Sequence, residues 1–153
     1  MGEQKTKNKT LDMLIKNEET VAVLYEAYAT KFPKESDFWN DLAKEEKTHA
    51  SWIENFYNDK KDLVSINDKR FKPEIFEISL KYMSEKLDEA IDRDAEITHK
   101  EALSVALGLE TGMIERGYFE VFETDSAELK ETLQNLAAAT IKHTDKIREK
   151  LFK

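Results

Sequence analysis

The chain has 153 residues, 40% of them hydrophobic, and a formal net charge of −8. This length fits a single domain, residues 1–153, with a core large enough to fold without covalent cross-links. The absence of cysteine excludes disulfides, thiolate zinc sites and iron–sulfur clusters, and the acidic balance argues against a nucleic-acid partner. Because 37% of the residues are charged and only four are glycine and two proline, we predict an all-α fold built from long helices.

The first predicted helix covers residues 10–31. Apolar residues recur there at three- and four-residue spacing, which is the pattern of one buried helix face. Glu18 falls on this apolar stripe, and Tyr25 follows it two turns later. Pro33 should end the helix, since proline lacks the backbone N–H that a continuing helix needs.

A second helix is predicted to continue to about residue 57, after a cap at Ser36 or Asp37. Its apolar stripe includes Glu46 and His49, which form a Glu-x-x-His motif. Residues three apart lie on the same side of a helix, so both side chains should face the core. Residues 10–57 are therefore predicted to form one helix pair.

Residues 58–97 are predicted to be a long crossover that contains a helix from Pro73 to Asp92, because proline is well tolerated at the first helical position. A second helix pair should occupy residues 98–152. Its first helix is predicted to run to Glu123 and carries Glu110 on the apolar stripe.

The last helix should start at a capping box, Asp125 followed by Glu128, and it carries Thr140 and His143 on its apolar face. The eight residues that end at His143 repeat the eight that end at His49, but Thr140 stands where the first half has Glu46. Two such helix pairs predict a four-helix bundle with one long crossover.

The inward polar residues are candidate metal ligands. Burying an unpaired carboxylate costs several kcal/mol, so carboxylates in one core need cations or protons. Carboxylates and imidazoles without sulfur suit iron or manganese, with zinc as an alternative. The predicted metal ligands are Glu18, Glu46, His49, Glu110 and His143. Thr140 and Tyr25 are candidates for a supporting role near the metal, although an aromatic at position 25 is also typical of ordinary core packing.

These motifs resemble the ferritin-like superfamily, and most closely the erythrin domain of rubrerythrins. The resemblance implies a di-iron site in which Glu18, Glu46 and His49 serve one iron and Glu110 and His143 the other, with Glu46 bridging. It further implies an oxidoreductase that reduces peroxide or dioxygen with electrons from an external donor, in a homodimer. No apolar run approaches the roughly 20 residues that span a bilayer, so we expect a cytoplasmic protein without a membrane partner.

The chain also departs from the family pattern. Thr140 replaces a bridging glutamate, Met113 replaces a further glutamate, and no rubredoxin-like segment with its cysteines is present. Three outcomes remain open: a two-metal site completed by water or another anion, a single-metal site at Glu18, Glu46 and His49, or a metal-free core with a protonated glutamate. In the last case the protein would be a structural or partner-binding helical module without redox activity.

Overall fold

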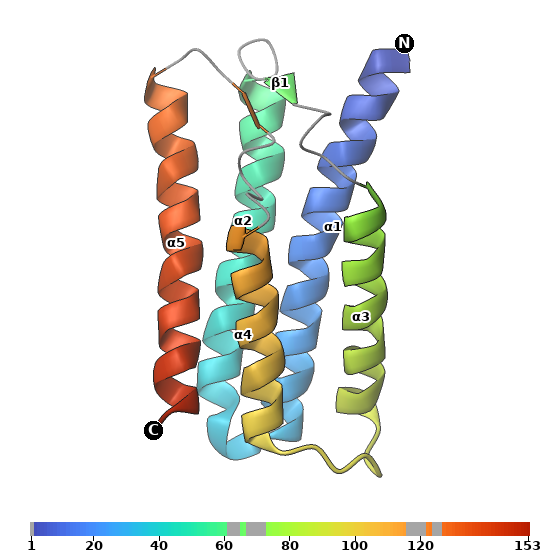
Figure 1. Cartoon of the computed structure of the whole chain (residues 1–153), viewed down its shortest axis with the longest axis vertical. Helices are drawn as coiled ribbons and strands as arrows, with labels where there is room; N and C mark the ends of the chain where they lie inside the picture. Colours follow the sequence, from blue (N-terminus) through green and yellow to red (C-terminus); the bar gives the residue numbers. More distant parts are fainter. Residues whose placement is uncertain (1, 61–64, 67–72, 116–121, 124–126) are drawn as a thin grey trace. The chain divides into compact units, whose positions relative to one another are not determined.

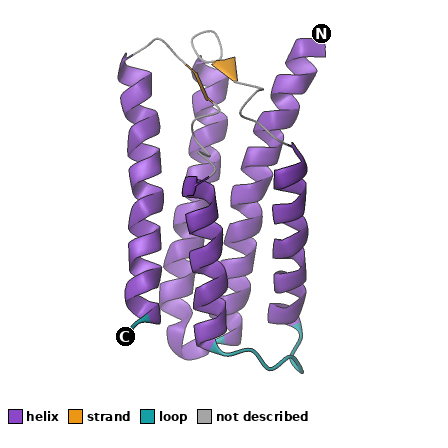
Figure 2. Ribbon diagram, in the orientation of Figure 1, coloured by secondary structure: helices purple, strands orange, loops and turns teal. Residues whose placement is uncertain are grey.

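The computed structural model describes residues 2–60, 65–66, 73–115, 122–123 and 127–153, and it confirms the all-α class (Figures 1 and 2). The α-helices are α1 (Gly2–Lys31), α2 (Ser36–Lys60), α3 (Pro73–Ile91), α4 (His99–Glu115) and α5 (Ala127–Leu151). A short 3-10 helix, η1 (Pro33–Glu35), joins α1 to α2. Two-residue strands β1 (Ser65–Ile66) and β2 (Phe122–Glu123) pair in antiparallel register.

The helices fall into two compact units. Unit 1 comprises Met1–Lys61 and Phe71–Glu96, and therefore holds α1, η1, α2 and α3. Unit 2 comprises Asp62–Arg70 and Ile97–Lys153, and holds the strand pair with α4 and α5. Both predicted helix pairs occur, since α1 packs on α2 and α4 packs on α5. Helix α3, which lies in the predicted crossover, packs on α1 and is the third α-helix of unit 1.

Helix α1 ends where the sequence predicted, just before Pro33. The last backbone hydrogen bond runs from Phe32 N–H to the carbonyl oxygen of Tyr28, at 2.9 Å. The chain then turns through η1 and returns along α1 as α2 (Figure 1). At this end of the pair the fully buried Trp39 ring lies 5.4 Å from Tyr25 and 4.9 Å from Tyr28, measured between ring centroids. These aromatic side chains fill the core between the two helices.

Helix α3 is fixed to α1 at two levels. In its middle, the buried Ser79 hydroxyl donates to Asn17 Oδ1 at 3.5 Å. At its C-terminal end, the ammonium of Lys31 donates to the carbonyl oxygens of Asp92 and Ala95, at 2.7 and 2.8 Å. This lysine ties α1 to the segment that follows α3, and its charge opposes the negative end of the helix dipole.

In unit 2, helix α4 starts at a capping box. Glu101 N–H donates to Thr98 Oγ1 at 3.0 Å, and Thr98 N–H donates to Glu101 Oε2 at 3.4 Å. Among the described side chains of α4 and α5, the buried apolar residues are small or aliphatic. They are Ala102, Leu103, Ala106, Leu109, Leu133 and Ile147.

Several predicted boundaries were wrong. The first helix begins at Gly2 rather than near residue 10, and α4 ends at Glu115 rather than at Glu123. Glu123 instead belongs to β2, whose partner β1 lies far away in the sequence, so local periodicity could not reveal the pairing. The predicted capping box at Asp125 falls outside the described residues. No helix in the described part of the chain combines the length and apolarity needed to cross a membrane.

Candidate metal centre

In unit 1, the predicted ligands Glu18 and Glu46 lie on the two helices that pack together, α1 and α2. Each side chain is 1% exposed. The residues one turn before them, Leu14 and Leu42, are buried apolar side chains, as is Ile53 further along α2. Both carboxylates therefore lie within apolar stripes, as the periodicity predicted.

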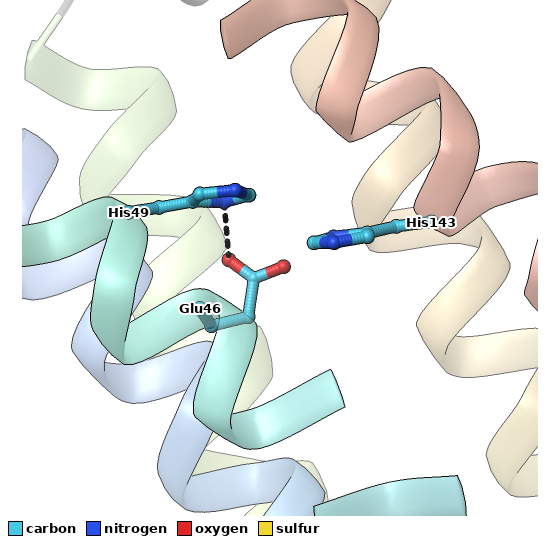
Figure 3. Close-up of side chains that lie close together, drawn as sticks. All are labelled: Glu46, His49 and His143. Atoms are coloured by element: carbon cyan, nitrogen blue, oxygen red, sulfur yellow. Dashed lines mark ion pairs between the residues drawn. The ribbon is translucent and has the colours of Figure 1, made fainter. Parts of the chain in front are cut away.

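His49 lies one turn beyond Glu46 on α2, and its side chain is 13% exposed. Its Nδ1 is 3.9 Å from Glu46 Oε2 (Figure 3). This separation exceeds hydrogen-bond length. Two atoms that each bind an ion such as zinc at about 2.1 Å can be at most about 4.2 Å apart, so this pair could share one ion. The Glu-x-x-His motif thus has a geometry that suits two ligands of one metal.

In unit 2, Glu110 on α4 is 0% exposed, and His143 and Thr140 on α5 are both buried. Thr144 is a fourth buried polar residue, and its hydroxyl donates to the carbonyl oxygen of Thr140 at 3.1 Å. Helices α4 and α5 contact each other, so this unit contains a buried polar stripe of its own. Among the described side chains this stripe contains one carboxylate, because Thr140 supplies a hydroxyl at the position equivalent to Glu46.

Figure 3 draws Glu46 and His49 of unit 1 and His143 of unit 2. Each offers one atom of a kind that binds metals, a carboxylate oxygen or an imidazole nitrogen. The described part of the chain contains no cysteine, so oxygen and nitrogen are the donors available. This donor set is the one that iron, manganese and zinc accept.

Tyr25 is fully buried, and its ring packs against Trp39 in the aromatic cluster of unit 1. This contact gives it the core-packing role that the sequence left as an alternative. The neighbouring Tyr28 was not singled out from the sequence. Burial raises the pKa of its phenol well above the usual value, and the negative charges that Tyr82 and Glu89 can carry raise it further. Its position three residues after Tyr25 on the same helix face was the available signal.

Asn17, Ser79 and Thr144 are further buried polar residues that the sequence reading missed. Asn17 is adjacent to Glu18 in the sequence, but it meets α3 through Ser79. The buried face of α1 is therefore wider than one stripe, because the helix contacts both α2 and α3. A second apolar stripe on α1 was the signal for this third helix.

Comparison with protein-family models, with curated proteins and with solved structures gave no match.

Proposed function

We propose that this chain binds a divalent transition metal, iron in the first instance with manganese or zinc as alternatives, through buried carboxylates and imidazoles. The proposed ligands are Glu18, Glu46, His49, Glu110 and His143. The observation that carries the proposal is the burial of three glutamates at 0–1% exposure within apolar stripes. Carboxylates in such surroundings are costly unless a cation or a proton neutralises them, and a bound metal supplies that charge.

Unit 1 carries the stronger part of the proposed site. Glu18 and Glu46 come from helices in contact, and His49 lies one turn from Glu46 with Nδ1 and Oε2 at a separation that a shared ion permits. A carboxylate pair with one imidazole supplies enough negative charge to balance a divalent ion. One ion held by unit 1 is the minimal form of the proposal. Glu46 and His49 already lie close enough to share an ion, whereas Glu18 does not belong to the group of possible ligands that the structure brings together and would have to move toward it.

Unit 2 offers a weaker ligand set. Glu110 and His143 supply one carboxylate and one imidazole, and the Thr140 hydroxyl adds no charge. A second ion that depends on these residues should bind less tightly than the first, or should require water or another anion to complete its coordination. The Thr140 hydroxyl could hydrogen-bond such a ligand.

Iron bound here would supply redox chemistry toward peroxide or dioxygen, with electrons from an external donor. The residues of the chain would hold the ion, exclude water from its apolar side and orient the carboxylates. This activity, a rubrerythrin-like four-helix arrangement, a homodimer and a cytoplasmic location are proposed from the resemblance of Glu18, Glu46-x-x-His49, Glu110 and His143 to the ferritin-like pattern.

A metal-free helical module with a structural or partner-binding role is the second candidate, and Thr140 favours it. A protein that does not bind a second metal could lose one bridging carboxylate without loss of function. In that case at least one buried glutamate would be protonated, since protonation removes the cost of burying its charge.

Metal content measured by elemental analysis separates these candidates. The protein purified without chelator, and again after reconstitution with Fe(II), should contain one or two ions per chain. Binding should also raise the melting temperature, since ligand at a hundredfold excess over Kd stabilises by about 2.7 kcal/mol. For a chain of this size that corresponds to a rise of roughly 5–10 °C.

A matched pair of variants makes this test specific. Glu18→Gln removes a buried candidate ligand, whereas Glu19→Gln changes an exposed neighbour on the same helix. Metal content should fall in the first and stay unchanged in the second. If the wild-type protein takes up no metal and shows no change in melting temperature, the metal-free module is the correct description. Peroxide consumption with a supplied reductant then distinguishes an enzyme from a metal store.

A further inference from the structure

A groove between α1 and α3 lies entirely within unit 1 and contains none of the proposed metal ligands. Its volume is about 580 Å³, which is within the range of about 300–1,000 Å³ that small-molecule sites occupy. The lining residues are Ala27, Thr30 and Lys31 from α1, and Ala90, Ile91 and Arg93 from the end of α3 and the loop that follows.

Three of the six residues that line the groove are apolar. Ala27 and Ala90 line it from the two helices, and Ile91 borders it with 65% of its surface exposed. Val23 lies one turn before Ala27 on α1 and is 46% exposed, so it extends the apolar face of the helix beyond the groove. The Thr30 hydroxyl donates to the carbonyl oxygen of Glu26 in its own helix, at 3.3 Å. A hydrocarbon body would therefore find an apolar surface here.

Both charged residues that line the groove are cations, in a chain with a net charge of −8. Lys31 is held by the carbonyl oxygens of Asp92 and Ala95, and an ammonium group has a third N–H to donate. Arg93 is exposed and makes no ion pair within the described part of the chain. The carboxylate of Asp92 next to it accepts a hydrogen bond from the backbone N–H of Asp94, at 2.9 Å.

The two cations lie at the same end of the groove. Helices α1 and α3 run in the same direction (Figure 1), and Lys31 and Arg93 both lie at their C-terminal ends. Helix C-termini are negative and would by themselves disfavour an anion. Lys31 offsets this with its positive charge, which lies beside the carbonyl oxygens of Asp92 and Ala95 just after α3. The guanidinium of Arg93 is exposed and can contact a ligand.

We propose that this groove binds a small amphipathic carboxylate, with a hydrocarbon body against Ala27, Ala90 and Ile91. The carboxylate would accept hydrogen bonds from the Arg93 guanidinium, whose planar fork suits two oxygens, and from Lys31. A ligand with a cationic head would meet two like charges at this end. The site is independent of the proposed metal centre, so the metal-free protein serves for the test.

Decanoate, decanol and decyltrimethylammonium form a probe set with the same chain and different head groups. Binding measured by isothermal titration calorimetry should be tightest for decanoate, weaker for decanol and absent for the cation. Arg93→Gln should weaken decanoate binding about tenfold, equivalent to about 1.4 kcal/mol, and leave decanol binding unchanged. Arg148→Gln is the matched control, because Arg148 is exposed on α5 and does not line the groove.

Ile91→Asn tests the apolar wall without adding charge, and it should weaken decanoate and decanol alike, without a change in the helical circular dichroism, because Ile91 is exposed. Three results would overturn the proposal. They are no decanoate binding at millimolar concentration, equal binding of decanoate and decanol, and decanoate binding that is unchanged in both Arg93→Gln and Ile91→Asn.

Discussion

Each of the two units contains a pair of packed helices with buried polar residues, but the units differ in how many of these residues could bind a metal. Unit 1 has Glu18, Glu46 and His49 on two paired helices, with α3 as an additional layer on α1. Among the described side chains of its helix pair, unit 2 has one buried carboxylate and one buried imidazole, with Thr140 at the position of the missing glutamate. Polar residues are therefore buried at equivalent positions in both units, although unit 2 has fewer carboxylates that could bind a metal. A buried position on the helix face does not by itself make a residue a strong metal ligand.

The two units also differ in the apolar side chains that the structure describes in their cores. The core of unit 1 is built around the fully buried Trp39 with Tyr25 and Tyr28 in contact, whereas the buried apolar side chains that the structure describes in unit 2 include Ala106 and Ile147. Large aromatic residues bury more apolar area per residue than alanine. The aromatic cluster should therefore contribute a large part of the buried apolar area of unit 1.

The largest expected effect is on folding. Trp39→Ala should destabilise unit 1 by about 3–5 kcal/mol, since it removes the central ring of the aromatic cluster. Amide hydrogen exchange should accelerate in α1, α2 and α3 more than in α4 and α5. Ile147→Ala, in the core of unit 2, is the reciprocal variant and should show the opposite pattern. Equal acceleration throughout the chain in both variants would mean that the units unfold as one body.

Metal affinity gives the next largest contrast. His49→Ala should weaken metal binding by at least about a hundredfold, or about 2.7 kcal/mol, because it removes a ligand from the more complete unit. His143→Ala should reduce affinity or stoichiometry less. Fe(II) titration of the two variants measures the difference. Equal losses would indicate a symmetric two-metal site and remove the proposed difference between the halves.

Restoring the missing carboxylate should make the halves more alike. Thr140→Glu should raise the number of ions bound, or raise affinity about tenfold, equivalent to about 1.4 kcal/mol. Thr140→Gln has the same length without the charge and should not reproduce the gain. If metal uptake by Thr140→Glu equals that of the wild type, then residue 140 does not correspond to a bridging position.

The smallest expected effect is a pH dependence confined to unit 1. Because the pKa of Tyr28 is raised in the folded chain, the phenol ionises first in the unfolded state. Stability should therefore be unaffected below about pH 10 and fall above it, by up to about 1.4 kcal/mol per pH unit. Tyr28→Phe should flatten this decline in urea unfolding measured from pH 9 upward. Tyr82→Phe removes one of the smaller causes of the raised Tyr28 pKa and should flatten the decline less than Tyr28→Phe does. An unchanged slope in Tyr28→Phe would contradict the assignment.

The sequence predicted the helices of both pairs because their apolar periodicity is local information. The burial of Glu18, Glu46, Glu110 and His143 follows from the same periodicity and is confirmed. The end of α1 at Pro33 was also readable, since it depends on one residue type. These features need no knowledge of which distant segments meet.

Features that depend on distant contacts could not be read in this way. The pairing of Ile66 with Phe122 joins segments far apart in the sequence, and it replaced the predicted end of a helix. The packing of α3 on α1 likewise requires knowing which face of a long helix meets a third partner. The capping box at Thr98 and Glu101 was readable in principle, because the Thr-x-x-Glu pattern precedes an apolar helix, but it was missed.

The hydrogen bond between Ser79 and Asn17 has a consequence for how the chain avoids misassembly. Apolar helix faces tolerate a slide of one turn, since one aliphatic contact replaces another. A slide of α3 along α1 would instead separate the Ser79 hydroxyl from the Asn17 amide oxygen, and a buried hydroxyl that loses its partner costs about 1–3 kcal/mol. A shifted arrangement would then be populated roughly thirtyfold less for every 2 kcal/mol. The Ser79–Asn17 hydrogen bond thus favours one register of α3 along α1 over its shifted alternatives.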